Sequence, residues 1–279
     1  MTGSPVLLAA LAGVLGLCFG SFANVVILRL PKMLEGIWRR EARTTLGLQP
    51  ETEAAINLWR PGSRCPHCGA PIKARHNIPL CGWLWLRGRA ACCGKPISPQ
   101  YPLVELICAA MFAASAWRFG AAPQLPAALA FGWMLLVLTA IDLRTQLLPD
   151  TLTLPLLWLG LLLSSARLFV APGAAIVGAA VGYGLLWLVF HGYRLATGKD
   201  GMGHGDFKLL AALGAWLGAA QLPLLLLLAS AAGALVGVGL ILLRGHDRRV
   251  PIAFGPYLAA AGWLLLLYGA PLSRLTAAL

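Results

Sequence analysis

The chain has very few acidic residues, and their scarcity limits the classes of protein to which it can belong. Its 279 residues include 10 Asp and Glu against 22 Lys and Arg, and charged residues of both signs make up only 11% of the total. Hydrophobic residues make up 59%, and the mean hydropathy is +0.77. A soluble globular domain is excluded, because so few charges cannot cover its surface.

Two further signals are missing from the chain. The first apolar stretch has no basic n-region, is too long for a signal peptide, and shows no small-residue cleavage pattern before Arg29. It is therefore expected to stay in the mature protein as a membrane helix. No glycine-rich loop follows a strand in the manner of a nucleotide-binding fold, so that class of cofactor site is not predicted.

Long apolar runs dominate what is present. A helix needs about 20 mostly apolar residues to cross a bilayer. Eight segments approach that length, at residues 5–30, 103–120, 125–143, 152–171, 173–193, 207–220, 222–243 and 252–270. The sixth is short and runs into Gln221 and Pro223, so the division between the sixth and seventh stays open. The sequence predicts an all-α polytopic membrane protein with about eight transmembrane helices.

The basic residues predict how these helices are oriented. Segment 31–102 carries 11 Lys and Arg against four Glu, and most other basic residues fall in alternate loops that would share its side. The positive-inside rule then places this segment in the cytoplasm and both termini outside. Asp142, Asp150 and Asp206 would all lie at the cytoplasmic edge. Because topology accounts for the basic residues, no basic patch remains to predict nucleic-acid binding.

The pattern divides the chain into three parts. Residues 1–31 are the first transmembrane helix, residues 32–102 a cytoplasmic loop domain, and residues 103–279 a membrane domain of seven helices. Within the loop domain, residues 61–100 are rich in Pro, Gly, Cys and Trp, which is typical of a small knuckle built from turns. Such a segment is too short for a large core, so we expect a staple or the membrane surface to hold it.

Five of the seven cysteines lie in that loop. In a reducing cytoplasm such cysteines predict metal binding rather than disulfides. The motif Cys65-Pro66-His67-Cys68-Gly69 has the spacing of half a zinc ribbon. The second half departs from it, because Ala90-Ala91-Cys92-Cys93 has alanine where the first cysteine of a Cys-x2-Cys pair would stand.

Two interpretations of this knuckle stay open. In one, zinc is held by Cys65, Cys68 and Cys93, with Cys92 or Cys81 as the fourth ligand. In the other, the knuckle is free of metal. Adjacent cysteines such as Cys92 and Cys93 rarely both bind one zinc with good geometry, which is the main argument against the first interpretation.

Asp142 and Asp206 carry the chemistry that the sequence predicts. Each lies where an apolar run meets a basic loop, and carboxylates at the edge of the hydrocarbon are costly and tend to be functional. Peptide hydrolysis by two carboxyls needs one ionised, to take a proton from water, and one protonated, to donate a proton. We therefore predict an aspartic protease dyad. The simpler roles are an N-cap for Asp206 and a basic partner such as Arg144 for Asp142.

Neighbouring residues are predicted to support the dyad. Gly203 and Gly205 permit backbone conformations closed to other residues and close approach of a substrate chain. Lys208 either steadies the Asp206 carboxylate or extends to the membrane interface. Asp150 follows Pro149, and its expected role is to cap the fourth helix.

Four stretches resemble the type IV prepilin peptidases, bifunctional enzymes of bacterial inner membranes. They are Gly20-Ser21-Phe22-Ala23-Asn24 with Arg29-Leu30-Pro31, Asn77-Ile78-Pro79 through Tyr101-Pro102-Leu103-Val104-Glu105, Ile141-Asp142-Leu143 through Leu148-Pro149-Asp150, and Gly201-Met202-Gly203-His204-Gly205-Asp206-Phe207-Lys208. They span nearly the whole chain in the expected order. Ala90, where the family has a cysteine, is the main departure.

The resemblance implies a function. Asp142 and Asp206 would cleave the leader from prepilins and pseudopilins of a type IV pilus or type II secretion system at the cytoplasmic face. The enzyme would then methylate the new N-terminal residue, commonly phenylalanine, with S-adenosylmethionine as methyl donor. The residues that bind this donor are not readable from the chain. Glu105 is one candidate, with anchoring of its helix as the alternative role.

Two other functions compete with this one. The first is a cleavage-only member of the wider Gly-x-Gly-Asp group of intramembrane proteases. The second is a transporter or assembly scaffold whose aspartates carry protons. Transporters usually place such carboxylates near the bilayer midplane, whereas Asp142 and Asp206 lie at the ends of apolar segments.

Overall fold

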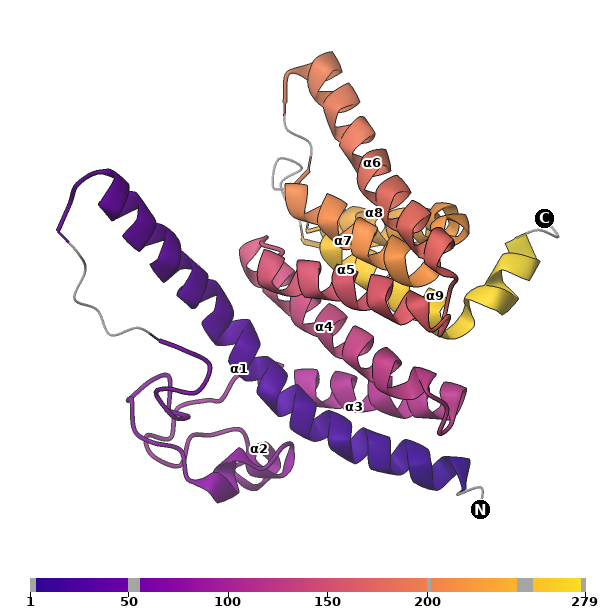
Figure 1. Ribbon diagram of the computed structural model, residues 1–279. Helices are drawn as coiled ribbons and strands as arrows, with labels where there is room; N and C mark the ends of the chain where they lie inside the picture. The colour runs from indigo at the N-terminus through magenta and orange to yellow at the C-terminus, as the bar shows by residue number, and fades with distance from the viewer. Residues whose placement is uncertain (1–3, 50–55, 200–201, 245–252, 277–279) are drawn as a thin grey trace. The chain divides into compact units, whose positions relative to one another are not determined.

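The computed structural model describes residues 4–49, 56–199, 202–244 and 253–276, and within these ranges the fold is helical (Figure 1). No strand occurs in the described ranges, where the only β-pairing is the two isolated bridges Arg64–Pro71 and Arg89–Pro96. Gly201 of the second aspartate motif lies outside them. The α-helices are α1 (Pro5–Thr45), α2 (Cys81–Trp85), α3 (Gln100–Phe119), α4 (Gln124–Thr145), α5 (Asp150–Ser165), α6 (Pro172–Thr197), α7 (His204–Leu217), α8 (Leu222–Arg244) and α9 (Gly255–Thr276).

The chain forms two compact units, Met1–Gly120 and Ala121–Leu279. The first contains α1, the cysteine-rich loops, α2 and α3. The second contains α4 to α9. This division differs from the boundary expected at residue 103, because α3 packs against α1 and so belongs to the first unit.

Glycines bring α1 and α3 into close contact in the first unit. A Cβ atom on Gly16 would lie 2.7 Å from Ala109 Cα, and one on Gly20 would lie 2.6 Å from Glu105 Cα. Two glycines four residues apart therefore let the helix backbones approach, as small residues do between membrane helices. Helix α1 also continues through Pro31 to Thr45, well past the expected end of the first helix at residue 31.

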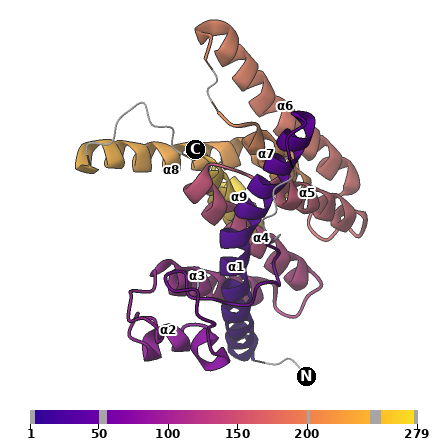
Figure 2. The same cartoon turned by 90° about the vertical axis from the view of Figure 1, so that its left-hand side faces the viewer.

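Helix α7 is the centre of the second unit, where it packs against α5, α6 and α9 (Figures 1 and 2). From Asp206 to Leu217 every residue of α7 except Lys208 is buried. Gly182 of α6 allows this packing, because a Cβ there would lie 2.6 Å from the Leu210 carbonyl oxygen. The buried Trp216 side chain donates a hydrogen bond to the Leu156 carbonyl of α5, at 2.9 Å. Helix α7, whose first turn carries Asp206, is thus held from several sides.

Among the residues that the structure describes, five helices are long and apolar enough to cross a membrane: α1, α3, α4, α6 and the segment Ala219–Leu242, which contains most of α8. Helix α5 and the segment Gly255–Gly269 of α9 are apolar but shorter. Helix α7, the sixth predicted segment, has 14 residues and ends before Gly218, whose φ of 79° closes the helix. An all-α membrane protein is confirmed, whereas the predicted total of eight spans stays a prediction.

Candidate active site and cysteine cluster

Asp142 and Asp206 both belong to the second unit, and both are buried, with 5% and 7% of their surface exposed. Asp142 lies in the last turn of α4. That helix ends because Gln146 takes a left-handed conformation, with φ of 53°, and donates its N–H to the Asp142 carbonyl at 2.9 Å. Asp206 lies in the first turn of α7, where its N–H donates to the Gly203 carbonyl at 3.2 Å. Each aspartate is therefore fixed by the end of a helix.

Leu148, in the loop between α4 and α5, links the elements around the two aspartates. A Cβ atom on Gly205, next to Asp206, would lie 2.7 Å from Leu148 Cβ. A Cβ on Gly255, the first residue of α9, would lie 2.5 Å from Asp142 Oδ2 and 3.2 Å from the Leu148 methyl carbons. The first turns of α7 and α9 therefore both pack against the loop that carries Leu148. The charge of Asp142 also acts on the Asp206 carboxyl, so the two groups lie within electrostatic reach.

Neither glycine next to Asp206 takes an unusual backbone conformation, and only Gly205 is needed for packing. Gly203 has φ of −79°, which any residue adopts, and Gly205 lies within the helix. The expectation that these two glycines supply conformations closed to other residues is therefore wrong. Gly205 is required because Leu148 occupies the space of a side chain. A Cβ on Gly203 would lie 3.9 Å from Asp206 Oδ2, an ordinary contact distance, so the space around Gly203 does not itself require glycine.

Lys208 pairs with Asp150 and does not hold Asp206. Its ammonium group donates to both carboxylate oxygens of Asp150 at 2.7 Å. Asp150 is the first residue of α5, Pro149 is the N-cap, and no side chain caps this helix. The expected capping role of Asp150 is therefore wrong. The ion pair joins the start of α5 to α7, two residues beyond Asp206.

The cysteine cluster lies in the first unit and is formed by two similar hairpins. Cys65 and Ala70 pair through a backbone hydrogen bond of 2.9 Å, and Ala90 and Lys95 pair in the same way at 2.8 Å. Gly69 and Gly94 occupy matching turn positions with φ of 71° and 69°. The bridges Arg64–Pro71 and Arg89–Pro96 close the two hairpins.

This correspondence shows where the two hairpins differ. Ala90 stands at the position of Cys65, and Cys93 stands at the position of Cys68. The thiol of Cys92 nevertheless reaches the cluster, with its sulfur 3.3 Å from Cys68 Sγ, while Cys65 Sγ lies 3.8 Å from Cys93 Sγ. All four sulfur atoms lie within 4.8 Å of one another. Cys81 is not a member of this group.

The cluster suits a zinc ion in geometry and in charge. Four thiolates at the usual Zn–S distance of about 2.3 Å form a tetrahedron with sulfur atoms about 3.8 Å apart. Hydrogen bonds from the backbone N–H groups of His67 and Cys68 lower the pKa of the Cys65 thiol to about 6. Side-chain hydrogen bonds with Cys68 and Cys65 raise the pKa of Cys92 to about 12. A cation would be needed to hold all four sulfurs as thiolates.

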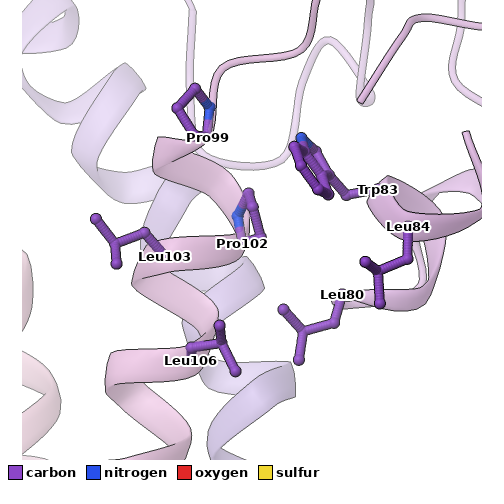
Figure 3. Close-up of a pocket in the computed structure, with 7 residues that line it drawn as sticks. All are labelled: Leu80, Trp83, Leu84, Pro99, Pro102, Leu103 and Leu106. Atoms are coloured by element: carbon purple, nitrogen blue, oxygen red, sulfur yellow. The ribbon is translucent and has the colours of Figure 1, made fainter. Parts of the chain in front are cut away.

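Glu105 anchors the knuckle to α3. Its Oε2 atom accepts a 2.8 Å hydrogen bond from the backbone N–H of Leu80, and its side chain is buried. Beside it lies a hollow of about 420 Å³ (Figure 3). The hollow is lined by apolar side chains, namely Leu80, Trp83, Leu84, Pro99, Pro102, Leu103 and Leu106. S-adenosylmethionine carries charged and hydrogen-bonding groups, so this lining does not fit it, and the geometry favours the anchoring role of Glu105.

Comparison with known proteins decides the family. Residues 14–119 match the bacterial peptidase A24 N-terminal domain, and residues 129–238 match the type IV leader peptidase family. A prepilin leader peptidase/N-methyltransferase of Aeromonas hydrophila is 53% identical over 98% of this chain and 94% of its own length. The chain belongs to the type IV leader peptidase family.

Other members of the family are similarly close. The prepilin leader peptidase/N-methyltransferase of Pseudomonas aeruginosa is 51% identical over 93% of this chain and 90% of its own length. The protein of that name from Xanthomonas campestris pv. campestris is 50% identical over 91% and 89%. No solved structure matches the chain. The two family regions fall within the two compact units, with the cysteine cluster in the first and both aspartates in the second.

Sequence reasoning missed two residues of the aspartate site, Leu148 and Gly255. Leu148 was quoted as part of the first aspartate motif, without a role. Phe254-Gly255-Pro256 reads as an ordinary helix start, because glycine and proline are common there. No pattern in the sequence indicates that these residues contact the two aspartate motifs.

Proposed function

We propose that this protein removes the leader peptide from prepilins by aspartic proteolysis at Asp142 and Asp206, and then methylates the new N-terminus with S-adenosylmethionine. The observation that carries the proposal is the convergence of two buried carboxyls, from the ends of α4 and α7, on the Leu148 loop. The family and the names of its members supply the substrate class and the second activity.

Two carboxyls that interact electrostatically can act as the general base and the general acid of peptide hydrolysis. Because like charges so close disfavour double ionisation, the pair holds one proton between them. The ionised carboxyl takes a proton from water, the water oxygen attacks the scissile carbonyl carbon, and the other carboxyl donates its proton to the carbonyl oxygen. Collapse of the tetrahedral intermediate breaks the C–N bond, the proton taken from water passes to the leaving amine, and a hydroxyl proton of the intermediate returns to the carboxyl that had protonated the carbonyl oxygen. The pair returns with one proton.

The Asp150–Lys208 ion pair positions this dyad. It ties the start of α5 to α7 two residues beyond Asp206, and so fixes the loop that carries Leu148 against the first turn of α7. Gly205 supports the same contact by leaving room for Leu148.

The protein lies in the bacterial inner membrane, with both termini outside and the aspartates at the cytoplasmic face. Helices α1 and α3 to α9 provide the eight spans of this topology. Its support is the excess of basic residues in segment 31–102 and in the alternate loops. A prepilin or pseudopilin with an apolar helix after its leader would present the scissile bond at the same depth, among membrane lipids.

Zinc bound by Cys65, Cys68, Cys92 and Cys93 holds the knuckle together. The two hairpins have little apolar core of their own, and a structural metal supplies folding energy to segments of this kind. The fourth ligand is Cys92, which compensates for Ala90. In this proposal the role of the metal is structural.

The direct test is to incubate the purified protein with a prepilin and S-adenosylmethionine and to determine the mass of the product. We expect loss of the leader and the addition of one methyl group to the new N-terminus. A product that is cleaved but never methylated would identify a cleavage-only protease. An uncleaved prepilin would refute the proposal.

A further inference from the structure

The start of α9 contributes to the aspartate site. Gly255 is buried and is the first residue of this 22-residue helix. A Cβ atom there would lie 2.5 Å from Asp142 Oδ2, closer than non-bonded atoms approach, and 3.2 Å from both methyl carbons of Leu148. The space that a side chain would need is therefore already filled by the two motif residues.

The backbone N–H of Gly255 is the donor that this helix offers to Asp142. Pro256 has no N–H, while the N–H groups of Tyr257 and Leu258 lie 3.1 and 3.3 Å from the Phe254 carbonyl oxygen. The Gly255 N–H interacts with the Asp142 carboxyl, as the first N–H groups of a helix do with anions. Oδ2 of Asp142 is buried and has no hydrogen-bond partner among the described residues.

We propose that Gly255 is a positioning residue of the protease site, whose N–H orients the Asp142 carboxyl and whose lack of a side chain keeps Oδ2 free to face the attacking water. This inference rests on the proposed function of the dyad. It makes α9 a third element of the site, beside α4 and α7. Any side chain at position 255 displaces either Asp142 or Leu148, and Leu148 in turn contacts Gly205 next to Asp206.

Gly255→Ala tests this assignment, with Gly262→Ala as a matched control. Gly262 lies in the same helix, and its added Cβ would lie 2.5 Å from Leu213 Cδ2, the same overlap against a side chain remote from the dyad. Displacing a catalytic group by about 1 Å costs about 10²-fold in rate. We expect Gly255→Ala to lower kcat for prepilin cleavage by about that factor with KM little changed, and Gly262→Ala to keep kcat within a few-fold.

A second variant separates the contact with Asp142 from the contact with Leu148. Leu148→Ala removes the methyl carbons that crowd position 255, so Gly255→Ala in this background has room to fold and still meets Oδ2. We expect the double variant to keep a kcat about 10²-fold below that of Leu148→Ala alone. Methylation of a pre-cleaved pilin peptide, measured on the same preparations, reports whether each variant is folded.

The outcomes distinguish this inference from the proposed function. Wild-type protein that leaves prepilin intact refutes the proposed function itself. Wild-type protein that cleaves, together with a Gly255→Ala variant no slower than Gly262→Ala, overturns the role of Gly255 alone. Full recovery of kcat in the double variant to the level of Leu148→Ala also overturns it, because the effect would then come from packing against Leu148.

Discussion

The cysteine cluster and the aspartate site are assembled in different ways. The cysteines lie on two hairpins close together in sequence, and three of the four are exposed. The aspartates come from the ends of two helices, and both are buried. In the proposed zinc site, Cys92 replaces the cysteine that is absent at position 90, because the turns of the same hairpin bring its sulfur into reach. No other Asp or Glu lies within two residues of Asp142 or Asp206, so a similar replacement is not open to the aspartate site.

The largest effect is therefore expected at the dyad. Replacing Asp142 or Asp206 with Asn keeps the shape of the side chain and removes its acid–base function. We expect each substitution to lower prepilin cleavage by at least about 10³-fold, since general acid–base catalysis contributes about 10² to 10⁴. Cleavage is measured by electrophoresis of the prepilin after timed incubation.

Methylation of a pre-cleaved pilin peptide serves as the control for the two aspartate variants, and it should be unchanged. If an Asn variant at either position cleaves prepilin at a tenth of the wild-type rate or faster, that residue is not part of the dyad.

Replacing the fourth ligand should weaken metal binding by the cysteine cluster. Cys92→Ser is expected to lower bound zinc from one ion to well below one per protein, measured by elemental analysis. Cys81→Ser is the matched control, because Cys81 lies in the same loop outside the cluster, and it should keep one ion.

A double substitution sharpens the test of the cluster. Ala90→Cys with Cys92→Ala rebuilds the regular spacing, since position 90 matches Cys65 in the paired hairpins. We expect this variant to bind one zinc ion and to resist heat as the wild type does. Wild-type protein free of zinc, or Cys92→Ser with a full ion, would contradict the assignment of Cys92.

A smaller effect is expected from the ion pair between Asp150 and Lys208. Its side chains are 52% and 33% exposed, and pairs of this kind contribute about 0.2 to 1 kcal/mol. Asp150→Lys and Lys208→Asp should each slow cleavage several-fold by placing like charges together. Their combination should recover most of the rate, because it restores the pair in reverse. A combined variant slower than either single one would show that the pair does not hold the loop against α7.

The sequence predicts much of this fold, because each apolar run corresponds to a helix. It also identifies both aspartates, since carboxylates at the ends of such runs are unusual. The continuation of α1 to Thr45 was not predicted. The apolar pattern ends near Pro31, and the polar residues that follow give no sign that the helix goes on. The grouping of α3 with α1 depends on the close contact at Gly16 and Gly20. The spacing of these glycines predicts a close helix contact but does not say which helix makes it.

Tertiary contacts account for the features that the sequence does not reveal. Lys208 and Asp150 are 58 residues apart, and each has a plausible local role that hides their pairing. The hairpin geometry brings the sulfur of Cys92 into the cluster. From the sequence alone, its position next to Cys93 argues against both cysteines binding one metal ion. Gly255 is recognised only when Asp142 Oδ2 is seen in the place of its side chain.

A double-mutant cycle on prepilin cleavage tests most directly whether Asp142 and Asp206 act as one unit. The rates of Asp142→Asn, Asp206→Asn and the double variant are compared with the wild-type rate under single-turnover conditions. Groups that share one catalytic step are strongly non-additive, so we expect the double variant to be no slower than the slower single variant. Losses that multiply in the double variant would show that the two carboxyls act independently and would contradict a shared site.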